Sequence, residues 1–382
     1  MTDSPHSRSM QNNTEQDSDS VSDSSPPQIL IIGGGLPSIV FARLLNQSGF
    51  TPAIAPTMIP SDDNQIYSLS RSALRVLDKA GLRDQIENHS HSPARTHAHM
   101  LPTGESVRDS SRSNVSLITG NTVQSVIQRQ RDSNDDISVL SRQISKIRPN
   151  KRSVIIQFDG GHTEAFDVVV SSQKAGLPGH STRHTTGVHV WRFQIENADN
   201  AQTHINEVWG HSRAAIHLNF SDRSHLTLIS CENIESTQVV RAEMIRCHFH
   251  ELIKRLSVQA EKLTDSSLEY SQIVMSIPRN LVNSLHARIA SACHPASPAE
   301  SIISSLGIED ACGLAEQIHT HQNNPKRALS SFEAARRSRQ DSLSYQNKLD
   351  HHWSRHLNTL SPPIQFLCIR RHHHYQTNLP TE

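Results

Sequence analysis

Three consecutive glycines, Gly33 to Gly35, separate a short apolar segment from a helical pattern. This order suits pyrophosphate binding, because Gly33 permits a tight turn and Gly35 lets the backbone approach phosphate oxygens. The positive end of the following helix would then face the negative charge. Ser38 stands where the G-x-G-x-x-G pattern has its third glycine, which serves close helix packing. The loop predicts a dinucleotide site formed by Gly33, Gly34, Gly35 and Ser38, and the alternative is a tight turn without a ligand.

Two clusters rich in histidine have the composition of metal sites. "CHFH" contains Cys247, His248 and His250, and "RRHHHY" contains His372 to His374. The first lies in a helical pattern, where adjacent side chains point in different directions, and the second lies in a polar tail. The five cysteines are an odd number and include no C-x-x-C pair. We therefore expect no metal site, no disulfide framework and a reducing, cytoplasmic compartment.

Glu309 and Asp310 have the side chains of an acid–base pair. Adjacent residues on a helix diverge by about 100°, and both lie in the first turns of a helix expected over 308–319. Negative charge in a first turn complements the helix dipole. We therefore expect these carboxylates to have a structural role.

Strands and helices alternate in the first half of the chain. A strand over 28–32 leads into a helix over 37–47, which Gly49 ends. A second helix begins after Ser70 as its N-cap and ends at Gly81. The elements expected after these are a hairpin around Asp159 and Gly160, strands over 168–170, 187–195, 214–220 and 224–230, and helices over 239–256, 308–319 and 328–357.

This order predicts an α/β fold in which a Rossmann-like, dinucleotide-binding domain is interrupted by a strand-rich domain and followed by C-terminal helices. Residues 1–27 are rich in Ser, Asp, Asn and Gln and are expected to be a disordered tail. The α/β domain would comprise 28–182 and 284–325, and the strand-rich substrate domain 183–283. Residues 326–382 would form a C-terminal helical segment and tail.

The charge balance argues against a polyanionic partner. Lys and Arg number 37 and Asp and Glu number 37, so no overall field would hold the protein on nucleic acid. Aromatic residues make up only 4%, which argues against base stacking. No apolar run has the length of a membrane span. We expect a cytoplasmic protein that is either soluble or peripherally associated with a membrane.

Several motifs occur at spacings typical of one enzyme family. They are Gly33-x-Gly35, "DNQIYSLSRSALRVLDKAGLRD", "FDVVVSS" and "ACHPASPAESIISSLGIEDACGLAEQI". The last is the most specific, because six positions agree: His294, Pro295, Pro298, Gly307, Glu309 and Asp310. Over nearly all of 28–356 the chain resembles the flavoprotein aromatic hydroxylases of the para-hydroxybenzoate hydroxylase type, most closely the ubiquinone-biosynthesis hydroxylases. The resemblance implies bound FAD, reduction by NAD(P)H, and hydroxylation of an activated ring with O₂.

The resemblance also places the cofactor contacts, and several have changed. Pro56 replaces an acid that accepts from the adenosine ribose, and Gln65 replaces an arginine near the diphosphate. Ser291 replaces the aspartate that holds the ribityl chain, and Ser171 to Lys174 replace Gly-Ala-Asp-Gly. Ser301 to Ile303 replace Gly-Gln-Gly, whose backbone freedom a β-branched residue lacks. The implied cofactor residues are Gly33, Gly34, Gly35, Ser38, Gln65, Ser291 and Ser301.

Two hypotheses follow. The first is an FAD- and NAD(P)H-dependent monooxygenase that hydroxylates a prenylated phenol on the way to ubiquinone. The second is a non-catalytic relative, which keeps the fold as a scaffold or as a subunit that binds a phenol or quinone intermediate in a quinone-biosynthesis protein complex. Gly33 and Gly35 favour the first, whereas Pro56, Ser291 and Ile302 favour the second.

Overall fold

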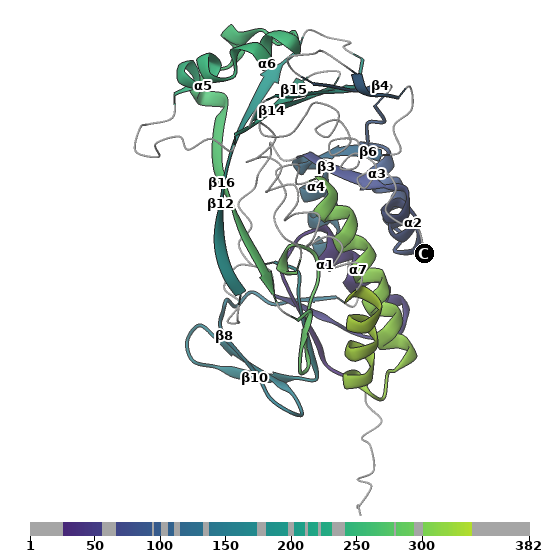
Figure 1. Ribbon diagram of the computed structural model, residues 1–382. Helices are drawn as coiled ribbons and strands as arrows, with labels where there is room; N and C mark the ends of the chain where they lie inside the picture. Colours follow the sequence, from purple (N-terminus) through teal and green to yellow (C-terminus); the bar gives the residue numbers. More distant parts are fainter. Residues whose placement is uncertain are drawn as a thin grey trace, which may run out of the picture.

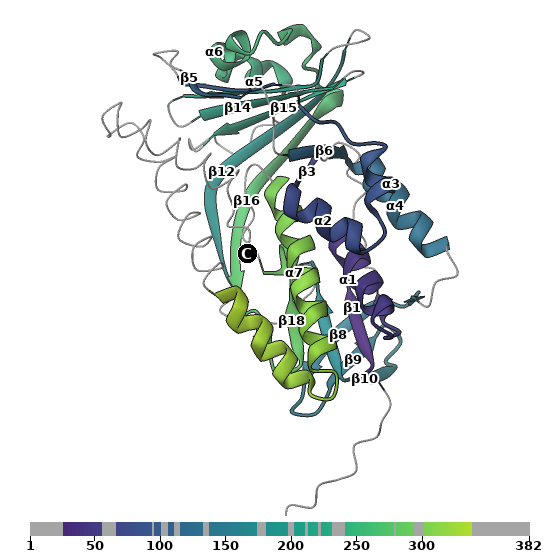
Figure 2. The same ribbon diagram turned by 90° about the vertical axis from the view of Figure 1, so that its right-hand side faces the viewer.

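The computed structural model describes residues 26–55, 66–93, 95–100, 106–110, 115–132, 137–173, 181–197, 202–210, 213–220, 223–230, 241–278, 280–293 and 301–337. Two sheets lie at opposite ends of the molecule, and the long strands β12 and β16 run between them (Figure 1). Helices α1 and α7 lie together beside the lower sheet, as a view from the side also shows (Figure 2). The expected tail over 1–27 lies almost wholly outside the described residues.

The lower sheet has six strands in the order β17-β18-β11-β1-β2-β7, and all are parallel except β17. Its central strands are short apolar runs buried along their whole length, as parallel strands covered on both faces require. The predicted α/β fold class is therefore confirmed. The strands are β1 (Ile29–Ile32), β2 (Ala53–Ala55), β7 (Ser138–Val139), β11 (Val168–Ser171), β17 (Val282–Asn283) and β18 (His286–Arg288).

Glycines end the first helices, as predicted. The helix α1 (Leu36–Gln47) is followed by Gly49 at φ +86°, and α2 (Arg71–Lys79) by Gly81 at φ +69°. Ser70 is the N-cap of α2, and its hydroxyl accepts a hydrogen bond from the Ala73 amide at 3.1 Å. Two further helices are α3 (Arg83–Glu87) and α4 (Gly120–Asp132).

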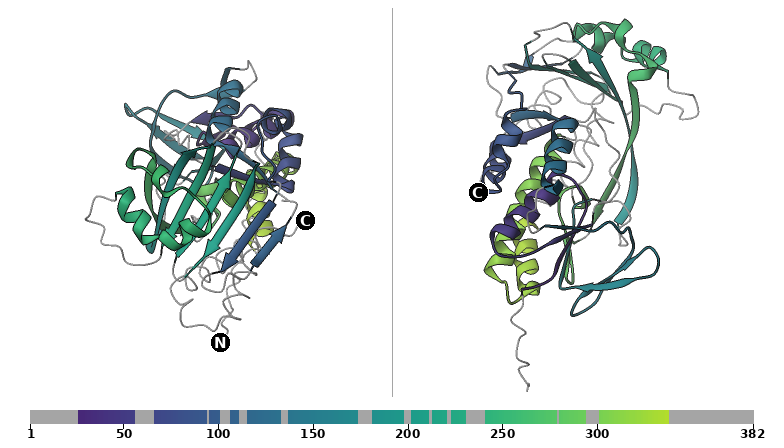
Figure 3. Two further views of the ribbon diagram at one scale, coloured as in Figure 1. Left: turned by 90° about the horizontal axis from the view of Figure 1, so that it is seen from above. Right: turned by 180° about the vertical axis from the view of Figure 1, so that it is seen from behind.

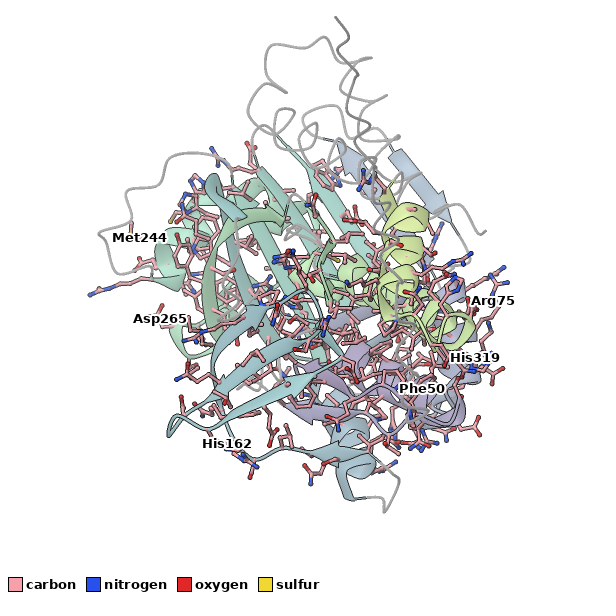
Figure 4. All side chains as sticks on the ribbon, turned by 90° about the horizontal axis from the view of Figure 1, so that it is seen from below. Phe50, Arg75, His162, Met244, Asp265 and His319 are labelled. Atoms are coloured by element: carbon pink, nitrogen blue, oxygen red, sulfur yellow. The ribbon has the colours of Figure 1, made fainter. Side chains whose placement is uncertain are left out.

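Two small antiparallel sheets complete this part of the chain. The predicted hairpin at Asp159 and Gly160 is confirmed, with Gly160 at φ +85° and Gly161 at φ +86° in its turn. His162 projects from the same hairpin end (Figure 4). The strands are β8 (Ile144–Pro149), β9 (Val154–Phe158) and β10 (Thr163–Phe166) in one sheet, and β3 (Ile66–Ser70) and β6 (Val115–Thr119) in the other.

The upper sheet has seven strands in the order β16-β12-β15-β14-β13-β4-β5. Its strands are β4 (Arg95–Met100), β5 (Ser106–Ser110), β12 (Ser181–Glu196), β13 (His204–Trp209), β14 (Arg213–Asn219), β15 (Arg223–Ser230) and β16 (Leu268–Pro278). β4 and β5 come from inside 28–182, the range predicted to form part of the α/β domain. β4 joins this sheet by parallel pairing with β13, a long-range contact that strand patterns do not encode.

Helices α5 (Ala242–His248) and α6 (His250–Arg255) lie over part of this sheet (Figure 3, left). The expectation of one continuous helix over 239–256 is wrong, because the helix breaks at Phe249. This side chain is fully buried and its ring meets Trp191 edge-on, with centroids 5.5 Å apart. The break lets both helices place apolar residues on the sheet. The short 3₁₀ helices are η1 (Ala260–Lys262), η2 (Asp265–Ser267) and η3 (Ala290–Ala292).

The helix α7 (Ser301–Thr320) is followed by a helical stretch over 325–337, and the rest of the helix expected over 328–357 lies outside the described residues. Arg336 joins the two: its Nε is 3.4 Å from Oδ1 of Asp310, and its Nη2 donates to the Glu309 carbonyl at 2.8 Å. Asp310 is 2% exposed.

Arg336→Met is expected to lower the free energy of unfolding by about 2 kcal/mol, because it leaves a buried carboxylate without its cation. Methionine keeps the apolar stem, so charge and hydrogen bonding account for the loss. Arg337→Met is the matched control, since Arg337 pairs with Glu333 on the surface, and it should change stability by less than about 0.5 kcal/mol. Urea denaturation measures both variants, and equal losses would contradict the assignment.

Among the described residues, none of the helices has both the length and the apolar character needed to cross a lipid bilayer.

Candidate functional site

The loop between β1 and α1 lies at the carboxyl end of the central strand, where ligands bind in open α/β sheets. Gly33 has φ +129°, which L side chains rarely adopt. Its amide donates to the Ala55 carbonyl at 3.0 Å, which ties the loop to β2. A Cβ added at Gly33 would overlap Oγ of Ser172 and lie 3.3 Å from Oγ of Ser38. The protein's own packing therefore requires glycine at this position.

Gly35 differs from Gly33 in its backbone conformation and in the space available for a Cβ. It is the N-cap of the 12-residue α1, with φ −79° and ψ 174°, a conformation open to any residue. Among the described residues, a Cβ placed there would meet only Cδ of Pro37, at 3.8 Å. The positive end of α1 and the open space at Gly35 thus keep one feature of a pyrophosphate cradle.

Ser38, the replacement for the third glycine, is buried at the base of the loop. Its hydroxyl is 2.7 Å from that of Ser172, which follows β11, and the two residues are 0% and 3% exposed. Ser172 Oγ also lies 3.4 Å from the Ile32 carbonyl. Two residues that depart from the family pattern are therefore each other's partners.

Ser291, which stands for the ribityl-binding aspartate, lies in η3 beside the same loop. Its hydroxyl donates to the Ser172 carbonyl at 3.1 Å. Ala290 precedes it, with φ +51°. A Cβ added to Gly307 of α7 would lie only 2.5 Å from Cβ of Ala290. α7 is thus packed tightly against η3.

Ser301, Ile302 and Ile303 are part of α7, so the backbone at the family's Gly-Gln-Gly positions is helical in this chain. Because α7 begins at Ser301, Glu309 and Asp310 are not in a first turn, and the expected dipole role is wrong. Glu309 Oε1 accepts hydrogen bonds from the hydroxyls of Ser70 and Ser72 instead, and Asp310 is paired with Arg336.

Other predicted residues lie outside the described residues: Pro56, Gln65, His294 and the cluster at His372 to His374. In "CHFH", Cys247 is exposed on α5 and His248 ends that helix. No three His, Cys, Asp or Glu side chains in the described ranges are grouped so that they could hold a metal ion.

A buried polar pair lies in the core of the lower sheet, next to the loop. The Ser171 hydroxyl is 2.8 Å from Nε2 of His286, and the two residues are 0% and 1% exposed. Desolvation, with the nearby Arg288 cation, lowers the pKa of His286 to about 3. The imidazole is therefore neutral at pH 7, and its burial makes it a structural residue.

The upper sheet presents an apolar row on the face opposite α5 and α6. Trp209, Ala214, Ile229 and Val190 are register partners across four strands and form one small cluster. Further along this face, Ile205 packs with Leu117 of β6, so the face is turned toward the α/β part. No sequence motif predicted this row, although its residues stand at the alternating positions of each strand that share one face of the sheet.

A polar row runs beside the apolar one. Glu207, 8% exposed, accepts a hydrogen bond from Nε1 of Trp209 at 3.0 Å. Arg192 lies in register with Glu269 and donates to Oγ of Ser271 at 3.1 Å. An aromatic edge, a carboxylate and a guanidinium therefore border one apolar strip.

No model of a protein family and no curated protein matches the sequence. Solved structures match its fold. HpxO from Klebsiella pneumoniae, complexed with FAD and uric acid, is 15% identical, with a TM-score of 0.68 over 92% of this chain and 98% of its own. The 2,6-dihydroxypyridine-3-hydroxylase from Arthrobacter nicotinovorans is 13% identical, with a TM-score of 0.71 over 88% and 95%. PqsL from Pseudomonas aeruginosa, a probable FAD-dependent monooxygenase, is 15% identical, with a TM-score of 0.70 over 86% and 96%.

The donor set around the loop decides whether FAD fits. Ser38, Ser172 and Ser291 each have a hydrogen-bond partner within the protein, so none of the three hydroxyls depends on a ligand for its hydrogen bond. The backbone over Ser301 to Ile303 is helical where glycines were expected to leave room for the ring system. Only Gly35 and the start of α1 match the requirements of a pyrophosphate. The described residues therefore do not fit FAD as the resemblance implies.

Proposed function

We propose that this chain, which has the fold of the FAD-dependent aromatic hydroxylases, is a non-catalytic relative that binds a prenylated phenol or quinone intermediate. It would act as a binding subunit of a quinone-biosynthesis protein complex in the cytoplasm, peripherally associated with the membrane that holds such lipids. The observation that carries the proposal is the internal bonding of Ser38, Ser172 and Ser291 at the place where a flavin nucleotide was expected.

The upper sheet supports a binding role. Val190, Ala214 and Ile229 are buried, and Trp209 is the half-buried member of the row, so the Trp209 ring is the part that would contact an aromatic ligand. Glu207 beside it can accept a hydrogen bond from a phenol hydroxyl, and one good polar contact in an apolar site is sufficient to orient a ring. Binding of this kind needs no cofactor.

The second candidate is an FAD- and NAD(P)H-dependent ring monooxygenase. The space that the described residues leave at Gly35 and the positive end of α1 favour it, because both suit a diphosphate. Bound FAD would supply the oxidation chemistry, and Gly34 and Gly35 would be the residues nearest its phosphates. The two candidates differ in flavin content, which a spectrum measures directly.

The purified protein is expected to be colourless, and added FAD is expected to bind with a Kd weaker than about 10 µM. Each hydrogen-bonding side chain that the implied FAD site lacks weakens binding by roughly 1–3 kcal/mol. The measurement is the 450 nm absorption band, followed by a fluorescence titration with FAD. Stoichiometric flavin in the purified protein would reject the non-catalytic proposal and leave the monooxygenase in its place.

A ligand titration tests the binding role separately. A short-chain prenylated phenol should bind the protein, and Trp209→Ala should weaken that binding about tenfold or more, because the variant has no aromatic anchor. Met244→Ala is the control, since Met244 is 46% exposed on α5, over the other face of the sheet. Equal affinities in all three proteins would reject the proposed surface.

A further inference from the structure

Three buried or half-buried hydroxyls meet where four elements of the α/β part come together. Ser38 belongs to α1, Ser172 follows β11, and Ser291 lies in η3. The fourth element is β1. The carbonyl of its last residue, Ile32, accepts a hydrogen bond from the Ser172 amide at 2.9 Å. β1 and α1 are neighbours in the sequence, whereas β11 and η3 come from far along the chain, and the hydroxyls add side-chain hydrogen bonds to the backbone bonds between these segments.

Each hydroxyl in this group has a partner within it. Ser38 and Ser172 are 2.7 Å apart, Ser172 Oγ lies 3.4 Å from the Ile32 carbonyl, and Ser291 donates to the Ser172 carbonyl at 3.1 Å. Ser172 Oγ also fills the space beside Gly33, and Cγ of Gln173 lies 3.5 Å from the position of a Cβ there. The base of the glycine loop is therefore filled and hydrogen-bonded by protein atoms.

We infer that this group, which we call the serine brace, holds the β1–α1 junction without any nucleotide. Ser172 is its centre, because both other hydroxyls bond to that residue. The consequence is that neither FAD nor another adenine dinucleotide adds to the stability of this protein. The inference concerns the junction alone and is independent of the aromatic ligand proposed above.

A double-mutant cycle on the full chain tests the brace. Ser172→Ala and Ser38→Ala should each lower the Tm by about 2–5 °C, because each removes the hydrogen bond between the two buried hydroxyls. The fall in Tm of the double variant should be clearly smaller than the sum of the two single falls, because the bond between the two hydroxyls is lost only once. Ser145→Ala, on the exposed edge of β8, should shift the Tm by less than about 1 °C. Additive losses, or losses no larger than that of the control, would overturn the brace.

The same melts with 100 µM FAD, and separately with 100 µM NADH, test independence from nucleotide. The Tm of the unaltered protein should move by less than about 1 °C with either compound. A ligand that binds only the folded state raises the Tm by an amount that grows with the ratio of its concentration to its Kd, so a rise of several degrees with FAD would overturn the inference. The prenylated-phenol titration does not depend on this result: a rise with FAD counts against both proposals, whereas absent phenol binding counts against the proposed function alone.

Discussion

Gly33→Ala is expected to lower the free energy of unfolding by roughly 2–6 kcal/mol, a large share of the stability of an ordinary domain. Two causes add. A φ of +129° strains any residue with a Cβ, and the new methyl group would overlap Oγ of Ser172 in a buried place. Urea denaturation followed by circular dichroism measures the loss.

Gly35→Ala is the matched control, two residues along the same loop. Because Gly35 has φ −79° but is the N-cap of α1, where alanine is less favourable than glycine, alanine there should lower the free energy of unfolding by about 1 kcal/mol or less. The backbone at this position shows no strain, so any glycine requirement there would come from a ligand. Equal losses of stability in Gly33→Ala and Gly35→Ala would contradict the conformations described for these two glycines.

Stability is expected to fall steeply as the pH drops from about 6.5 toward 3. Desolvation lowers the pKa of His286 to about 3 and that of His217 to about 4, below the ordinary value of 6.5. Within this window the unfolded chain binds protons that the folded chain does not, so lower pH favours unfolding. Above pH 6.5 both states are neutral and this contribution is fully present. Each group adds up to about 1.4 kcal/mol per pH unit.

His286→Gln should flatten the pH dependence of the free energy of unfolding in this window, at some cost in stability at pH 7. His319→Gln should leave the slope unchanged, because His319 is exposed at the end of α7 (Figure 4). The measurement is urea denaturation at several pH values between 7 and 4. An unchanged slope in the His286→Gln variant would show that the His286 imidazole of the unaltered protein titrates equally in the folded and unfolded states.

Much of the fold could be predicted from local sequence. The buried run at Ile29–Ile32, the apolar face of α1 and the stops at Gly49 and Gly81 depend on periodicity and on backbone freedom. These are properties of neighbouring residues, so a single chain displays them. The α/β class followed from their order and is matched by the solved structures.

The roles of the individual site residues were decided by the tertiary structure. Ser38 looked like a tolerable replacement for glycine, yet its partner is Ser172, 134 positions away. Gly33 looked like a phosphate contact, yet the Ser172 hydroxyl already requires glycine there. β4 joined the upper sheet by pairing with β13, more than a hundred residues along the chain. A sequence determines which residues can turn, bury or bond, but which of them meet depends on packing between distant segments. For that reason only the folded structure showed that the serines bond to one another.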